Sequence, residues 1–489
     1  MAKTFHSYNP VDGEIVGTFP AMNAKEVAAA VATAHDAFEY WGAAPFKVRR
    51  KTLLKFSEAI LNEIDQLATL VTTETGKPHS DAKLEISLAA HHIAWAARTS
   101  EKVLRTAHRS PGLLMANMSA TVERSPLGVV GVIGPWNYPV FTPMGSIGYA
   151  FAAGNTVVFK PSEYTPGVGN ALAELFATVA GRSDIFQVVT GLGETGAALC
   201  SSNIQKLAFT GSTATAKKVA ALCAERLIPV IAECGGKDPV IVASDADIAK
   251  AVDATIWSAM SNAGQTCIGA ERVYVDEKIA DLFIEKAVAL ASTIHAGSPD
   301  EANYGPATMP SQIKIIESHI KDGIKKGGVA ALGSAKSVKA PFVQPVILVD
   351  VPENSTAVTE ETFGPTLVIN RVPDMATAIS LANASRYGLG AAVWSRRGGR
   401  AIAAQLQCGM VAINSTISFA SVASVPFGGV KDSGYGRIHG PEGLLEFTYA
   451  RSVVRARFQL PLAITSFKRT SKIDSLVVTI LKLLRGRLS

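Results

Sequence analysis

The stretch VVGVIGPWNYP, residues 129–139, is the first of five similar segments that decide the fold. It is a short apolar run stopped by glycine and proline, which predicts a buried strand that enters a loop. Similar segments follow at a regular interval with helical stretches between them, and this alternation predicts an α/β fold with a parallel, doubly wound sheet. The later segments are NTVVFKPSE (155–163), FQVVTG (186–191), KLAFTGS (206–212) and PVIAECGG (229–236).

The chain on both sides of this series is also patterned. Residues 25–105 carry apolar side chains at helical spacing, which predicts helices. After Asp238, strands and helices alternate again to about residue 430, which predicts a second α/β domain with a boundary near residues 235–236. The stretch 451–458 alternates in the manner of a late strand.

The composition is that of a large globular protein. The 489 residues are too many for one ordinary core, and 48% hydrophobic against 18% charged residues argues against disorder. Of the 47 Lys and Arg residues, nine lie from Arg451 onward, where Asp474 is the one acid. The rest of the chain is therefore nearly neutral despite a net charge of +6, which argues against nucleic acid as a partner.

Cysteine usage and the first residues bear on the compartment. The five cysteines show no CxxC and no zinc spacing, which predicts a reducing, cytoplasmic environment and no metal site. The first residues contain no apolar run typical of a signal peptide. The sequence also contains no run of about 18 apolar residues, so we expect no membrane-spanning helix.

Three residues are candidates for chemistry, and each has a structural alternative. Cys267, in GQTC, follows a helical stretch and a glycine, where a loop would present a thiolate, although a lone cysteine is often a small buried apolar residue. Glu233 ends an apolar strand, at the edge of the sheet where open α/β folds place their active sites. The structural alternative is a solvated acid at a strand end. Asn137 lies between two prolines, where its amide can donate a hydrogen bond to a developing oxyanion. The structural alternative is an asparagine that stabilises a turn.

Other segments suit a dinucleotide. FTGST, residues 209–213, places a turn between a strand and a helix, where backbone N–H groups bind anions, although it is not a complete GxGxxG. Lys160 and Glu163 follow another strand and supply a donor and an acceptor suited to ribose hydroxyls. EETFGP, residues 360–365, is expected at a strand-to-turn boundary.

Together these motifs resemble the aldehyde dehydrogenase superfamily, of the NAD(P)-dependent, hydrolytic type. The resemblance covers roughly residues 5–458 and is specific, because unrelated proteins would not collect seven ordered motifs by chance. The motifs are PWN (135–137), KPSE (160–163), FTGST (209–213), ECGGK (233–237), GQTC (264–267), EETFGP (360–365) and PFGG (426–429).

The resemblance implies a role for each matching residue. Cys267 is the implied nucleophile, Glu233 the general base, and Asn137 with the Cys267 backbone N–H the oxyanion hole. NAD is the implied cofactor, with NADP as the alternative. The implied cofactor-binding residues are Ile133, Pro135, Trp136, Lys160, Glu163, Gly193, Phe209, Gly211, Ser212, Glu361 and Phe363, and the implied substrate tunnel has Tyr138, Thr142, Gly145 and Phe427.

The resemblance also implies a domain plan. A Rossmann-like NAD(P)-binding domain would comprise residues 1–112 and 126–235, followed by an α/β catalytic domain of residues 236–446. A small β oligomerisation arm would comprise residues 113–125 and 447–458. Homodimers or homotetramers are the implied assemblies.

Two departures from the family pattern matter. Ala216 stands where the family often has a glycine that opens the helix after FTGST, which weakens the expectation of a close pyrophosphate approach. Thr142 and Gly145 stand where many relatives place bulky Met or Trp residues, which predicts a wide tunnel.

The tail, residues 459–489, predicts a basic amphipathic helix, because apolar residues recur at helical spacing among lysines and arginines. It is too short to span a bilayer. Two interpretations stay open: the helix packs on the protein or a partner, or it lies in an anionic membrane surface as a peripheral contact. In character the tail resembles the C-terminal extension of membrane-associated fatty aldehyde dehydrogenases, and with the wide tunnel it predicts apolar aldehydes of medium to long chain.

The expected activity is therefore the oxidation of an aldehyde to a carboxylic acid through a thiohemiacetal and thioester on Cys267. An acylating dehydrogenase that transfers to coenzyme A is one alternative, but that subgroup typically lacks the glutamate base that Glu233 matches. A non-catalytic relative is a second alternative, and the joint presence of Cys267, Glu233 and Asn137 argues against it.

Overall fold

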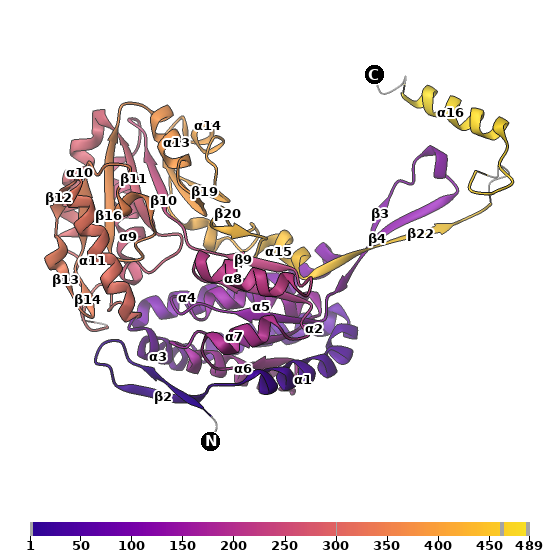
Figure 1. The fold of residues 1–489 in the computed structure, drawn as a ribbon, viewed down its shortest axis with the longest axis horizontal. Helices are drawn as coiled ribbons and strands as arrows, with labels where there is room; N and C mark the ends of the chain where they lie inside the picture. Colours follow the sequence, from indigo (N-terminus) through magenta and orange to yellow (C-terminus); the bar gives the residue numbers. More distant parts are fainter. Residues whose placement is uncertain (1–2, 300, 460–463, 486–489) are drawn as a thin grey trace.

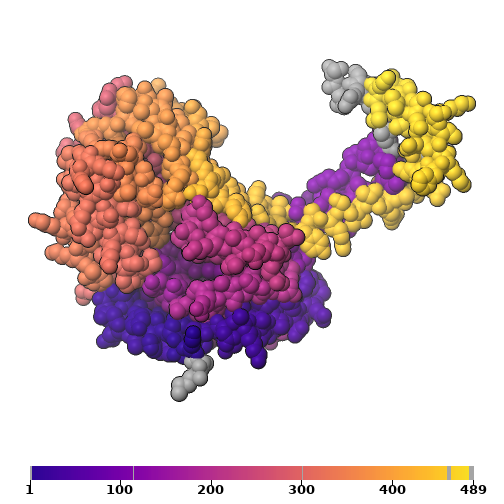
Figure 2. All heavy atoms as spheres, viewed as in Figure 1, coloured from indigo at the N-terminus to yellow at the C-terminus, as the bar shows by residue number. Residues whose placement is uncertain are grey.

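The computed structural model describes residues 3–299, 301–459 and 464–485. Two mostly parallel sheets lie side by side in it, and a thin arm leaves the body (Figure 1). The arm projects well clear of the body and carries the C-terminal helix at its far end (Figure 2). The predicted α/β fold class is confirmed.

The first sheet has the strand order β21-β9-β8-β5-β6-β7. From β5 the chain moves outward through β6 and β7, then returns to the other side of β5 for β8 and β9. The strand order reverses between β5 and β8, and open α/β sheets bind ligands outside the carboxyl ends at such a point. The five predicted strands are confirmed as β5 (Val129–Ile133), β6 (Thr156–Lys160), β7 (Phe186–Val188), β8 (Lys206–Thr210) and β9 (Val230–Glu233), with helices α5 (Phe141–Ala153), α6 (Pro166–Ala180), α7 (Gly193–Cys200) and α8 (Thr213–Ala224).

The helical prediction for residues 25–105 is confirmed by four helices that follow a hairpin. A capping box begins the first of them: the Asn23 side chain accepts hydrogen bonds from the N–H groups of Lys25 and Glu26, and the Glu26 carboxylate accepts one from Asn23 N. The elements are β1 (Thr4–Tyr8), β2 (Ile15–Pro20), α1 (Ala24–Ala43), α2 (Phe46–Asn62), α3 (Ile64–Thr75) and α4 (His79–Leu104).

The second sheet has the order β12-β15-β16-β11-β10-β18-β19, and its pairs are parallel except for β12 with β15. Every residue of β10 and β11 is buried, as expected for a parallel sheet covered on both faces. Its strands are β10 (Asp238–Val242), β11 (Ala270–Asp276), β12 (Val329–Leu332), β15 (Val346–Val349), β16 (Thr366–Val372), β18 (Gly390–Trp394) and β19 (Met410–Ile413). Its helices are α9 (Ile248–Met260), α10 (Glu277–Ala291), α11 (Pro310–Lys325), α12 (Thr356–Thr359), α13 (Met375–Asn383) and α14 (Gly399–Ala403).

The arm is a three-stranded antiparallel sheet of β22 (Thr448–Ala456), β4 (Met118–Pro126) and β3 (Ala107–Arg109). The predicted late strand is therefore confirmed. Beyond it, the predicted tail helix is present as α16 (Ser471–Arg485), at the end of the arm that is remote from the body (Figure 1). Residues 460–463 and 486–489 of the predicted tail lie outside the described residues.

Three details differ from the sequence-based expectations. The strand β21 (Gly434–Tyr435) pairs with β9, and α15 (Gly440–Glu446) packs on α4 and α5, so the chain after β20 (Val430–Lys431) returns to the first domain before residue 446. The arm starts earlier than residue 113, because β3 belongs to it. EETFGP connects α12 to β16, so it is a helix-to-strand loop and not a strand-to-turn boundary.

Candidate active site

A cavity of about 230 Å³ lies where loops of the two sheets meet. Its wall includes two of the three residues predicted for chemistry, Cys267 and Glu233, and three of the four predicted tunnel residues, Tyr138, Thr142 and Phe427. The structure thus brings together side chains that are up to about 300 positions apart in sequence.

The loop before Cys267 has an unusual backbone. Asn262, Ala263 and Gly264 have φ values of 51°, 56° and 69°, the left-handed region that L-residues rarely adopt. A side chain at Gly264 would also collide with the backbone of Gly364. Asn262 Nδ2 donates to the carbonyl of Gln265 at 3.2 Å, which holds this conformation and presents Cys267 at the cavity.

Asn137 lies beside this loop and is buried. Its side-chain Nδ2 donates to the carbonyl oxygen of Gln265 at 2.8 Å, and its own carbonyl accepts from Asn262 Nδ2 at 3.1 Å. The next residue is tied in as well, because the Tyr138 hydroxyl lies 2.8 Å from Thr266 Oγ1. The amide is therefore fixed next to the Cys267 loop, with its second N–H not used by these contacts.

A buried ion pair that was not predicted from the sequence supports Asn137, and it joins Lys77, in the loop before α4, to Glu85 on α4. Lys77 Nζ lies 2.5 Å from Glu85 Oε2 and donates to the Asn137 carbonyl at 2.8 Å. Glu85 Oε1 accepts from the N–H groups of Val140 and Phe141 at 2.8 and 3.1 Å. The pair is far from Asn137 in sequence, so no local pattern could have identified it.

Acidic groups surround the Cys267 thiol. Burial raises its pKa well above the usual range, and the charges of Glu361, Asp238 and Glu233 raise it further. The Cys267 side chain is nevertheless partly exposed, because it faces the cavity. The apoprotein therefore holds this cysteine mainly as the neutral thiol at neutral pH.

Glu233 ends β9 and is 3% exposed. Neither carboxylate oxygen has a hydrogen-bond partner among the described residues. Burial raises the pKa of Glu233 well above its usual value, while the nearby Arg437 opposes the shift. A buried carboxyl with a raised pKa binds a proton more readily than an exposed one and can exchange it with a molecule in the cavity.

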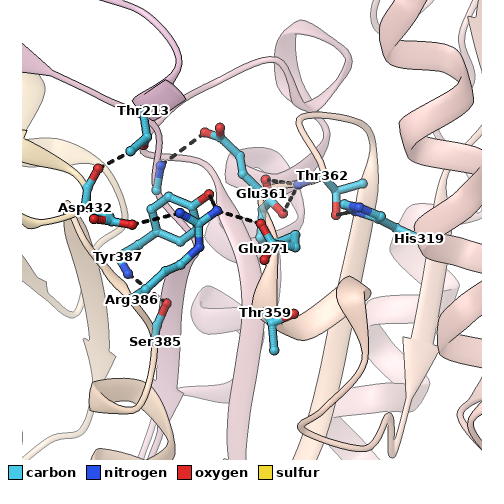
Figure 3. A network of polar contacts seen from close by, with 12 residues as sticks. Thr213, Glu271, His319, Thr359, Glu361, Thr362, Ser385, Arg386, Tyr387 and Asp432 are labelled. Atoms are coloured by element: carbon cyan, nitrogen blue, oxygen red, sulfur yellow. Dashed lines mark hydrogen bonds and ion pairs between the residues drawn. The ribbon is translucent and has the colours of Figure 1, made fainter. Parts of the chain in front are cut away.

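Glu361, which is labelled in Figure 3, reaches from the second domain to the glycine pair after β9. Its Oε1 accepts from Gly236 N at 3.1 Å, and a side chain at Gly235 would collide with its carboxylate. Burial and the charge of Glu271 raise the pKa of Glu361 to about 8.

Glu271 anchors the loop that carries Glu361 and Phe363. Its carboxylate accepts from Thr362 N at 2.8 Å and from Phe363 N at 3.1 Å, and it pairs with the buried Lys237. Phe363 has a φ of 51°, so these bonds hold a strained backbone. Glu271 was not among the predicted site residues, although an acid inside the apolar run AERVYV was a signal for a buried charged network.

The remaining predicted cofactor residues gather at the carboxyl edge of the first sheet. Lys160 Nζ, at the end of β6, lies 3.6 Å from Glu163 Oε2, and Ser212 is the N-cap of α8. The Trp136 ring meets the Phe363 ring edge-on at 5.6 Å. Ile133 and Phe209 lie on the neighbouring strands β5 and β8, Pro135 and Gly211 follow these strands, and Gly193 begins α7.

This edge fits a dinucleotide. The N-termini of α7 and α8 point N–H groups toward it, and a Cβ at Gly193 would meet nothing within 4 Å, so the approach to α7 is open. Ala216 packs in the apolar core beneath α8, behind the first turn of that helix.

One predicted tunnel residue does not line the cavity. The space that a Gly145 side chain would occupy is filled by the imidazole of His439, whose Nε2 would lie 2.5 Å from a Cβ at that position. The absence of a side chain at Gly145 therefore does not widen the cavity, and the expectation of a wide tunnel at this point is corrected.

Neither a metal cluster nor a spanning helix is present among the described residues. No group of three His, Cys, Asp or Glu side chains in that part of the chain is arranged to hold a metal ion. No helix of residues 3–299, 301–459 and 464–485 is both long enough and apolar enough to cross a membrane.

Comparison with known proteins agrees with this geometry. The model of the aldehyde dehydrogenase family matches residues 1–453. A glutarate-semialdehyde dehydrogenase of Pseudomonas aeruginosa is 37% identical, covering 91% of this chain and 94% of that protein. A 4,4'-diapolycopene aldehyde oxidase of Methylomonas is 36% identical, covering 94% and 87%. The crystal structure of an NADP-dependent enzyme of E. coli superposes with a TM-score of 0.89 at 36% identity, covering 93% and 95%.

Proposed function

The chain belongs to the aldehyde dehydrogenase family, whose members oxidise aldehydes to acids with NAD or NADP, and we propose that its own substrates are apolar aldehydes of medium to long chain. The charge of the cavity wall carries this proposal. Among the described residues, Lys77 is the one Lys or Arg in the wall. It is paired with Glu85, and its side chain is 1% exposed.

A semialdehyde of a dicarboxylic acid carries a carboxylate at its far end. In this cavity such a group would meet no unpaired cation and would have to approach the acid Asp81. Burial of an unpaired charge is costly, so the wall disfavours it. Similar proteins are named both for semialdehydes and for 4,4'-diapolycopene aldehyde, and the apolar wall favours a substrate of the second kind.

Apolar side chains line the rest of the cavity and its entrance. Leu84 and Trp257 are in the wall yet remain 49% and 48% exposed, so they form an apolar rim at the surface. Phe141, Leu389 and Phe427 continue the apolar lining inward. An alkyl chain entering between Leu84 and Trp257 would bury its surface against these side chains.

The proposed mechanism assigns a task to each polar group. Cys267 releases its thiol proton to water in the cavity, and the thiolate attacks the aldehyde carbon. The resulting oxyanion accepts hydrogen bonds from Asn137 Nδ2 and the Cys267 backbone N–H. A nicotinamide cofactor bound at this site would supply the hydride acceptor for the oxidation, and the acyl group would remain on Cys267 as a thioester. Glu233 then removes a proton from the water that hydrolyses the thioester.

Residues at the carboxyl edge of the first sheet would hold that cofactor. Lys160 and Glu163 suit the adenosine ribose, and Gly211 and Ser212 at the α8 N-terminus suit the pyrophosphate. Glu361 and Phe363 suit the nicotinamide ribose and ring. We assign the further contacts of this site to Ile133, Pro135, Trp136, Gly193 and Phe209.

The substrate proposal is tested by comparing two aldehydes. We expect nonanal to give a kcat/KM at least about tenfold above that of glutarate semialdehyde with the wild-type enzyme, because a tenfold ratio needs only about 1.4 kcal/mol. Asp81→Asn should narrow this gap, and Asp12→Asn, at an exposed turn distant in sequence, is the matched control. A higher kcat/KM for the semialdehyde contradicts the proposal.

We also propose that the arm joins copies of this chain into a dimer or tetramer. Its strand β22 is an edge strand with exposed apolar residues, Tyr449, Val453 and Val454, which are 48%, 38% and 61% exposed. Unpaired strand edges with apolar side chains tend to pair with another chain. Sedimentation measurements on the whole chain and on a Val454→Lys variant test this, and a monomeric wild type contradicts it.

For the tail we propose contact with an anionic membrane surface. Leu476, Leu481 and Leu483 of α16 are 43%, 44% and 68% exposed, and Lys468, Arg469, Lys472 and Lys482 lie on or beside the helix. Such a helix can lie in a lipid interface, where each cation contributes on the order of 1 kcal/mol. Truncation after Phe458 should abolish co-sedimentation with phosphatidylserine vesicles; unchanged sedimentation means that the helix serves a protein contact.

A further inference from the structure

We propose that His439 recognises an uncharged oxygen, a hydroxyl or a carbonyl, carried by the substrate chain at a distance from the aldehyde. The inference rests on the proposed oxidation of apolar aldehydes and narrows their class to oxygenated ones. In this role His439 is a specificity-determining residue and takes no part in the bond-making steps.

The first observation is an unsatisfied side chain in the cavity wall. His439 is fully buried with respect to solvent and lines the same cavity as Cys267. Neither Nδ1 nor Nε2 has a hydrogen-bond partner among the described residues. Its neighbours are aromatic rings: Phe141 and Phe427 at 5.5 Å and Tyr149 at 5.7 Å between centroids. Buried polar groups without a hydrogen-bond partner are rare, because burial costs them their hydrogen bonds to water. A ligand in the cavity can replace these lost hydrogen bonds.

The backbone of His439 is the second observation. Its φ of 59° and ψ of 170° lie in a region that is essentially restricted to glycine. The side chain does not cap the helix that it precedes. Room for the ring is provided by Gly145 on α5, where any side chain would collide with Nε2. An imidazole is thus held here against both backbone preference and hydrogen-bonding preference, as occurs at ligand sites.

The charge state of His439 defines what it can bind. Burial and the neighbouring His92, whose ring centroid is 4.2 Å away, lower the pKa of His439 well below its usual value. The ring is therefore neutral, with one N–H donor and one nitrogen acceptor. A hydroxyl can use either nitrogen and a carbonyl can use the donor, whereas a carboxylate would find no positive charge.

The position of His439 separates it from the reacting atoms. Glu85 belongs to the ion pair that holds Asn137, and His92, which contacts His439, is seven residues further along α4. Seven residues of helix span roughly 10 Å. The oxygen that His439 binds is therefore expected several carbons from the aldehyde group.

The test compares substrates of equal length, octanal and 8-hydroxyoctanal. We expect the wild-type kcat/KM to be about tenfold higher for the hydroxyaldehyde, mostly through KM, as one hydrogen bond to a buried partner would provide. His439→Phe should abolish this preference, and His439→Asn, which keeps a donor and an acceptor, should retain part of it. The exposed neighbour of His92 supplies a control, His91→Phe, which should behave as the wild type.

A second experiment measures ligand binding in the absence of turnover. Calorimetry with Cys267→Ala should show tighter binding of octane-1,8-diol than of octan-1-ol, and the added His439→Phe change should remove the difference. Thermal melting confirms that the variants fold. The proposal is overturned if the wild type shows equal kcat/KM for the two aldehydes, or if Cys267→Ala binds the two alcohols with equal affinity. It is also overturned if either preference persists in His439→Phe. If neither aldehyde yields NADH or NADPH with the corresponding cofactor, the proposed function fails, and the calorimetry still decides whether His439 binds an uncharged oxygen.

Discussion

The side-chain amide of Asn137 donates a 2.8 Å hydrogen bond to the backbone carbonyl of Gln265, two residues before Cys267. This bond joins the loop after β5 in the first domain to the loop that carries the cysteine in the second. A donor held in this way needs no reorganisation when negative charge develops beside it, which is the condition for strong electrostatic stabilisation.

Replacing Asn137 by alanine should therefore lower kcat by about 100- to 1000-fold, the usual effect of losing one oxyanion donor. Stopped-flow measurement of the NADH burst isolates the chemical step, and Asn9→Ala at an exposed turn is the control. A burst rate within threefold of the wild type would remove Asn137 from this role.

Glu233→Gln should separate the two halves of the reaction. Because glutamine cannot accept the proton of water, we expect a burst of about one NADH per site followed by very slow turnover. In the wild type, turnover should rise with pH, since burial raises the pKa of Glu233 and only its ionised form is a base. If steady-state turnover of the Glu233→Gln variant equals that of the wild type, Glu233 is not the general base.

Glu361→Gln should make the Cys267 thiol more acidic. Above its pKa of about 8, Glu361 is ionised, and its negative charge raises the pKa of Cys267. Without that charge, iodoacetamide should alkylate the apoprotein faster at each pH above about 8, with the profile displaced to lower pH. The matched control is Glu360→Gln, since Glu360 is a more exposed neighbour paired with Arg386. Superimposable profiles would exclude this electrostatic coupling.

Glu163 should favour NAD over NADP. Its carboxylate, paired with Lys160 at 3.6 Å, is suited to accept from ribose hydroxyls and would repel a 2′-phosphate. Glu163→Gln should raise the ratio of kcat/KM for NADP to that for NAD by about three- to tenfold, a modest change because the side chain is partly exposed and screened. A wild type that prefers NADP, or a variant with an unchanged ratio, contradicts this assignment.

Local sequence patterns were sufficient for the strands and for the residues at their ends. The apolar runs from Val129 and Val230 end in glycine or proline, so the strands could be predicted, together with Asn137 in the loop after one and Glu233 at the end of the other. The strand β22 could be predicted in the same way, because apolar and polar residues alternate along residues 451–458.

Contacts between distant segments were not predictable from such patterns. β21 pairs with β9 across some 200 positions, and nothing in Gly434 or Tyr435 indicates it. Gly145 indicated a wide tunnel, but His439, nearly 300 residues later, fills that space. The loop of Phe363 depends in the same way on Glu271, a buried acid whose partner Lys237 lies on another segment.

We propose Cys267 as the nucleophile of an NAD(P)-dependent aldehyde oxidation. The most direct measurement is NADH formation from nonanal by Cys267→Ala, with Cys408→Ala as a control at another partly exposed cysteine. We expect no NADH from Cys267→Ala, with a melting temperature close to that of the wild type, and full activity from Cys408→Ala. Sustained NADH formation by the Cys267→Ala variant would contradict it.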